Sequence, residues 1–213
     1  MIITYHGKAH IKLQVGDFTV ACGPVSKDSK SKQTKYGADI ALIPLDMPDY
    51  NGVDNVTHGN KEPFVIKGAG EYEYNKFFVK AFSTPSTRDG KEYQNTSFIF
   101  NLDGIRVLYL GAIHQMLAPE HKEIIDNVDI VFVPIGGDAV SLNPYDASKL
   151  AMSLGPKVII PMDYTEDLLP IFLKESGAKA KTEGIENEIS EKLTLKYKDI
   201  SALECVVMRL HEM

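Results

Sequence analysis

Four short apolar runs constrain the fold of this chain more than any other feature. They lie at residues 39–43, 106–110, 129–133 and 157–160, and each begins with a polar residue and ends at Pro or Gly. Strands that are buried on both faces of a sheet have such unbroken apolar runs. We therefore expect four central strands whose exits gather at one sheet edge, where binding sites commonly form.

The rest of the chain predicts strands first and then alternating helices and strands. The pair Asp103-Gly104 is the strongest hairpin signal, and Asn143 before Pro144 is typical of a helix start. Residues 84–94 are polar and are interpreted as a connection. Further strands are expected at 2–5, 11–14, 18–22, 64–66, 71–74, 77–82, 96–102, 192–196 and 204–210, and helices after Pro119 and within 166–176.

This order predicts an α/β protein in which sheets are covered by helices. Hydrophobic residues make up 44% of the 213 residues and charged residues 24%, as in ordinary globular proteins. The length suits one domain over residues 1–213.

Charge and composition disfavour several partners. The net charge of −6 repels phosphate backbones, so no nucleic-acid partner is expected. No apolar stretch approaches the ~20 residues that span a bilayer, and the first residues lack the pattern of a signal peptide. Cys22 and Cys205 are expected as free thiols. These features favour a cytoplasmic protein with no membrane partner.

Several short motifs, taken in order, resemble the metallo-β-lactamase superfamily. They begin with Ile2-Ile3-Thr4-Tyr5-His6-Gly7 and end with Pro161-Met162-Asp163-Tyr164, and between them lie Gly70-Glu71-Tyr72-Glu73, Asn95-Thr96, Val107-Leu108-Tyr109-Leu110-Gly111 and Val133-Pro134-Ile135-Gly136-Gly137. The similarity is greatest to the branch of small bacterial metal-dependent hydrolases that includes the ascorbate-phosphate lactonases. The resemblance implies an αββα sandwich with its site at one edge between the two sheets.

The resemblance also implies where metal ligands would lie, and here the chain departs from the family. The family's T-H-x-H-x-D-H loop aligns with residues 44–50, where only Asp49 keeps its type. At the other aligned positions this chain has residues that differ from the family's metal ligands. They are Leu45, Met47 and Tyr50 in that loop, then Ser86, Ala112 and Asp163 further along.

The residues at these aligned positions predict weak metal binding at most. Leu45 and Ala112 have no lone pair, and the Met47 thioether suits soft ions rather than zinc. Zinc is therefore not expected, and no cofactor is expected. The remaining oxygen ligands, from Asp46, Asp49 and Asp163, are of the kind that holds Mg²⁺ or Mn²⁺.

Other roles for these residues stay open. Asp49 and Asp163 are either an acid–base pair or turn-capping residues, and Asp46 is either a ligand or solvated. Six histidines occur, and we interpret them as scattered structural residues. The exception is His114, two residues after Ala112, which is a candidate catalytic base together with Asp163.

Three functions follow from these observations. The first is a non-hydrolytic binding, scaffolding or regulatory protein, in effect a pseudoenzyme. The second is a hydrolase of phosphoesters or lactones with a carboxylate-held Mg²⁺ or Mn²⁺. The third is metal-free acid–base chemistry on a small metabolite. A small molecule or a protein is the expected partner, and a homo-oligomer is a further expectation.

Overall fold

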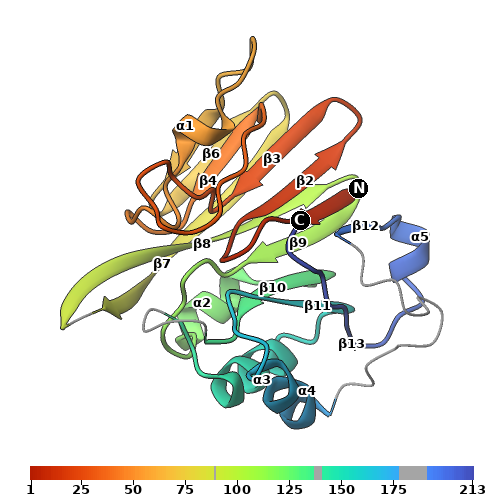
Figure 1. Ribbon diagram of the computed structural model, residues 1–213. Helices are drawn as coiled ribbons and strands as arrows, with labels where there is room; N and C mark the ends of the chain where they lie inside the picture. The colour runs from red at the N-terminus through yellow and green to blue at the C-terminus, as the bar shows by residue number, and fades with distance from the viewer. Residues whose placement is uncertain (89, 137–140, 178–190) are drawn as a thin grey trace.

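The computed structural model describes residues 1–88, 90–136, 141–177 and 191–213. Two β-sheets face each other, and helices lie mainly outside the second sheet (Figure 1). This arrangement confirms the predicted αββα class.

The first sheet has six strands in the order β12-β1-β2-β3-β4-β5. Antiparallel pairs join β12 to β1, β1 to β2 and β2 to β3, while β3, β4 and β5 are parallel. The bounds are β1 Ile2–Tyr5, β2 Ile11–Val15, β3 Phe18–Cys22, β4 Ile40–Ile43, β5 Phe64–Lys67 and β12 Lys192–Thr194.

The second sheet has seven strands in the order β13-β11-β10-β9-β8-β7-β6. Its half from β9 to β13 is parallel, and its half from β6 to β9 is an antiparallel meander. The bounds are β6 Gly70–Tyr74, β7 Phe77–Arg88, β8 Lys91–Leu102, β9 Ile105–Tyr109, β10 Ile130–Pro134, β11 Val158–Met162 and β13 Val206–Val207.

The four apolar runs are buried strands, as predicted, and they form β4, β9, β10 and β11. On β10, Ile130 and Phe132 join the core between the sheets, whereas Val131 and Val133 join the core under the helices. Residues on β10 thus alternate between the two cores, which explains why this strand carries no polar side chain.

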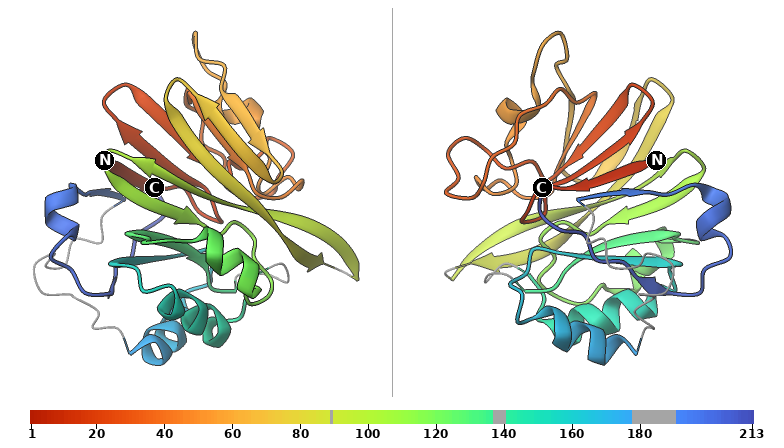
Figure 2. Two further views of the ribbon diagram at one scale, coloured as in Figure 1. Left: turned by 180° about the vertical axis from the view of Figure 1, so that it is seen from behind. Right: turned by 45° about the vertical axis from the view of Figure 1, so that its right-hand side comes forward.

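Helices α3 Pro144–Ser153 and α4 Leu169–Ser176 cover the outer face of the second sheet, and α2 Pro119–Ile124 lies near them (Figure 2). Asn143 caps α3 as predicted, because its side chain accepts hydrogen bonds from the backbone N–H groups of Tyr145 and Asp146. The remaining helices, α1 Val53–Val56 and α5 Tyr197–Ile200, are single turns that the sequence did not predict.

Two local predictions are wrong. Residues 84–94 are not a polar connection, because β7 and β8 continue through most of them as a hairpin that pairs from Val79↔Phe100 to Arg88↔Lys91. The end of this hairpin extends beyond the body of the molecule in Figure 1, so Lys91, Glu92 and Gln94 are exposed, whereas Thr84 and Ser86 are buried polar residues nearer the sheets. The last strand is also shorter than residues 204–210.

Two further expectations concern individual features. Cys22 and Cys205 are free thiols, as predicted. Gly137 of the Gly136-Gly137 motif lies outside the described residues. In the parts of the chain that the structure describes, no helix has both the length and the apolar character needed to cross a membrane.

Candidate functional site

The exits of β4, β9 and β11 meet at one edge between the sheets, as the apolar runs predicted. Asn95 of β8 ties two of these exits together: its Oδ1 atom accepts a hydrogen bond of 2.7 Å from the N–H of Ala112, and the backbone N–H of the adjacent Thr96 donates to Pro44 O. Gly111 has φ +65°, and a Cβ atom there would lie 2.5 Å from both Asn95 Oδ1 and Pro44 Cβ. Only glycine therefore fits this exit.

Apolar side chains fill the place that the family alignment assigns to metal ligands. Leu45, Met47, Tyr50 and Ala112 are all buried and belong to the hydrophobic core between the sheets. Ser86, also buried, donates a hydrogen bond of 3.4 Å to Ala112 O. The structure thus brings these aligned positions together as part of a packed core.

Of the three predicted carboxylates, Asp163 is the one that reaches this place. Its side chain is 1% exposed; Oδ2 accepts a hydrogen bond of 2.8 Å from the Tyr50 hydroxyl, and Oδ1 lies 3.7 Å from Lys8 Nζ. Its backbone N–H donates to Lys8 O and to the Tyr5 hydroxyl, which fixes the residue at φ +49°. Burial raises the pKa of Tyr5, so this hydroxyl stays protonated and serves as a neutral hydrogen-bonding group.

The other predicted carboxylates point elsewhere. Asp46 is exposed and forms an ion pair of 2.9 Å with Lys67, which lowers the pKa of its carboxyl group. Asp49 accepts hydrogen bonds from the hydroxyls of Ser29 and Ser31. Within the described ranges, no three His, Cys, Asp or Glu side chains form a group that could hold a metal ion. The structure therefore does not bring Asp46, Asp49 and Asp163 together.

His114 lies exposed on the loop after β9. Its role as a catalytic base stays a prediction, as does that of Asp163.

A cleft of about 470 Å³ opens beside Asp163. Its walls include Tyr5, His6, Lys8, Asp163, Tyr164 and His211. These residues come from the β1–β2 connection, the exit of β11 and the C-terminal segment. The cleft is therefore polar and is lined by both positively and negatively charged side chains.

The sequence interpretation missed His6 and His10. The tight connection after β1 brings their rings to a centroid distance of 4.9 Å, with the ring of Tyr36 beside both. His10 Nε2 lies 2.8 Å from the Tyr36 hydroxyl. Four-residue spacing indicates neighbours on a helix, and a turn between two strands gives the same proximity without a helical signal. Both histidines are buried structural residues, as interpreted, but they lie next to each other and are not scattered.

Two facing sheets with outer helices and a site at the strand exits define the metallo-β-lactamase class of αββα sandwich. A family model described as "Beta-lactamase superfamily domain" matches residues 2–163. The chain therefore belongs to the metallo-β-lactamase superfamily.

Individual relatives agree with this assignment. A UPF0173 metal-dependent hydrolase of Lysinibacillus sphaericus is 25% identical, over 77% of this chain and 85% of the relative. One of Listeria innocua is 24% identical with the same coverage. A crystal structure from Thermotoga maritima, proposed to be a zinc-dependent hydrolase of the superfamily, has 26% identity and a TM-score of 0.71 and covers 99% of both chains.

The family implies a two-ion centre, but the side chains at the aligned positions do not fit one. Leu45 and Ala112 offer no lone pair, and the Met47 sulfur accepts a contact of 3.7 Å from Arg88 instead. The Asp163 carboxylate is held by Tyr50, a protein hydroxyl. No step of a mechanism through bound ions can be derived from these residues. The replacement of the ligands stays a prediction that rests on the alignment of motifs.

Proposed function

We propose that the protein binds a small polar molecule in the Asp163 cleft and does not carry out two-ion hydrolysis. The observation that carries this proposal is the packing of Leu45, Met47, Tyr50 and Ala112 into the core between the sheets. Buried apolar side chains exclude the water and the ions that a hydrolytic centre needs.

The cleft beside this packed region supports binding. It is large enough for a metabolite, and small-molecule sites commonly combine such a volume with a few placed polar groups. Asp163, Tyr5 and Lys8 are fixed by hydrogen bonds or an ion pair, so the polar groups of the cleft need little rearrangement to receive a ligand.

The second candidate function is a metal-dependent hydrolase of phosphoesters or lactones. The names of the relatives favour this candidate over the first, because the curated relatives described above are named metal-dependent hydrolases. It requires ligands other than the set Asp46, Asp49 and Asp163, which the structure holds apart. A homo-oligomer or a protein partner stays a separate prediction.

Metal analysis of protein purified without chelator separates the two candidates. We expect no stoichiometric zinc, iron or manganese, no hydrolysis of p-nitrophenyl phosphate diesters or of simple lactones, and no change in melting temperature with millimolar Mn²⁺. A ligand that binds only the folded state must raise that temperature. Two ions per chain, or hydrolysis that Asp163→Asn abolishes, would overturn the first candidate.

A further inference from the structure

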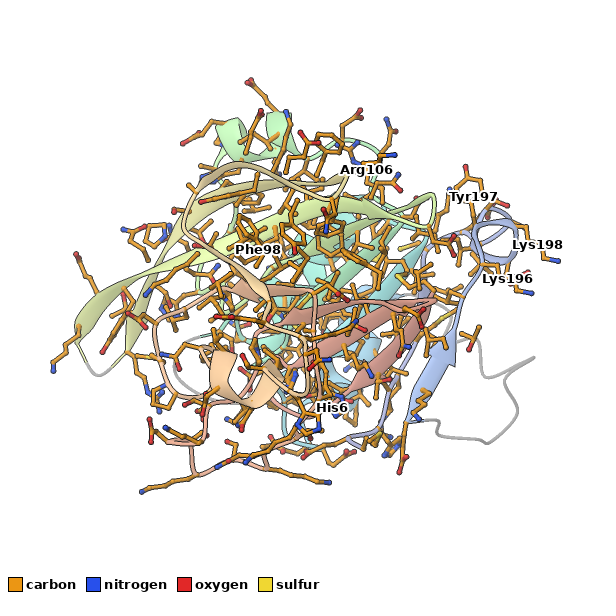
Figure 3. All side chains as sticks on the ribbon, turned by 90° about the horizontal axis from the view of Figure 1, so that it is seen from above. His6, Phe98, Arg106, Lys196, Tyr197 and Lys198 are labelled. Carbon is orange, nitrogen blue, oxygen red and sulfur yellow. The ribbon has the colours of Figure 1, made fainter. Side chains whose placement is uncertain are left out.

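His6 is a buried side chain without a hydrogen-bond partner. It follows β1 and is 2% exposed, and Figure 3 shows it at the ends of the N-terminal strands. Among the described residues, neither ring nitrogen of His6 has a hydrogen-bond partner. Buried polar atoms are nearly always paired, so an unpaired ring that lines a cleft indicates a place for a ligand.

The surroundings of His6 determine its charge. Burial lowers its pKa to about 4, and the nearby ammonium groups of Lys12, Lys32 and Lys192 act in the same direction. At neutral pH the ring is therefore neutral and offers one N–H donor and one acceptor nitrogen. Of these three lysines, Lys32 also lines the cleft, as does Lys8, so two positively charged side chains face the same space as His6.

Two of the carboxylates around the cleft are already paired, and Lys32 Nζ donates a hydrogen bond of 2.6 Å to Met213 O at the exposed C-terminal end, a contact that an incoming anion would replace. Asp163 is held by Tyr50 and Lys8, and Glu166 forms an ion pair with Arg209. Glu212 is the competing charge: it is exposed, and its carboxylate lies close against Gly7. An incoming anion would therefore meet the lysines and His6, with Glu212 and the terminal oxygen of Met213 as the competing groups.

We propose that His6, together with Lys8 and Lys32, binds the oxyanionic group of the cleft's ligand, a carboxylate or a phosphate. The His6 N–H donates to one oxygen, and the two ammonium groups, which also line the cleft, balance the charge. This inference rests on the proposed binding function of the cleft and adds the chemistry of the ligand.

Nuclear magnetic resonance of the histidine rings tests the site, with inorganic phosphate and acetate as probes and chloride at matched ionic strength as control. We expect phosphate or acetate, but not chloride, to shift the His6 ring signals saturably. The stronger of the two probes identifies the kind of oxyanion. Equal shifts with chloride would overturn the proposal.

Variants sharpen this test. His6→Phe should weaken binding of the oxyanion about tenfold or more, because it removes a donor to a charged group. His6→Gln keeps an N–H donor and should restore much of the affinity, and Glu212→Gln should strengthen binding. His58→Gln, on the exposed turn before β5, serves as the matched control and should bind as the parent does.

The results that would overturn the role of His6 differ from those that would overturn the proposed binding function. Unchanged affinity in a folded His6→Phe variant overturns the inference about His6. If that variant does not fold, failure of Glu212→Gln to strengthen binding overturns it instead. Stoichiometric metal or hydrolysis contradicts the binding function and leaves the oxyanion result standing.

Discussion

Truncation of Leu45 tests directly whether the aligned ligand loop is part of the core. Leu45 is 2% exposed and packs between the two sheets. Leu45→Ala removes buried methyl groups and leaves a cavity, which costs about 2–5 kcal/mol of unfolding free energy at fully buried sites. For a chain of this size, each kcal/mol lowers the melting temperature by roughly 2–4 °C. We therefore expect a decrease of about 4–20 °C and a clearly lower midpoint in urea.

Urea unfolding followed by circular dichroism and by fluorescence measures the change, and agreement of the two signals establishes a two-state transition. Met116→Ala is the matched control, because Met116 lies on a loop and is 43% exposed; its cost should stay within about 0.5 kcal/mol. A loss below about 1 kcal/mol for Leu45→Ala would refute the reasoning. That result would mean that the loop is open and able to rearrange around ions.

Three further predictions concern hydrogen bonds and pH. Tyr50→Phe removes the hydroxyl that donates to Asp163, so the unfolding free energy should fall by about 1.5–3 kcal/mol in urea titration, and an unchanged midpoint would contradict the bond. Asn95→Ala should lower the unfolding free energy by about 2 kcal/mol or more, because it leaves several buried groups unpaired. The control Asn101→Ala, at the exposed turn between β8 and β9, should lower it by less than half as much in the same assay. Because the pKa of His6 is lowered in the folded state, the unfolded state binds a proton on this ring at pH values where the folded state does not. The unfolding free energy should therefore fall as pH decreases from about 6.5 towards about 4. A His6→Phe variant should show a flatter decrease between those pH values, and parallel curves would count against the shift.

The sequence predicted those parts of the fold that depend on local patterns. The runs that became β9, β10 and β11 could be recognised because burial on both faces leaves no room for polar residues. Asn143-Pro144 and Asp103-Gly104 could be recognised because a cap and a tight turn need particular side chains.

Other parts depended on contacts that no local pattern shows. The outer end of the β7–β8 hairpin is exposed and polar, so it has the composition of a loop. The pairing of Tyr50 with Asp163 joins residues 113 positions apart. The histidines His6 and His10 meet across a turn, and their environment includes Tyr36, Lys32 and Lys192, which are distant in the sequence.

The last described segment completes both sheets at once. β12 pairs with β1 at the edge of the first sheet, and β13 pairs with β11 at the edge of the second. Until residues 192–207 have left the ribosome, the nascent chain therefore carries two uncovered strand edges, which are sites of misassociation. A stop codon or a fusion junction placed before residue 192 would leave both edges bare, so recombinant fragments of this protein should aggregate even though residues 2–163 hold the recognisable family sequence.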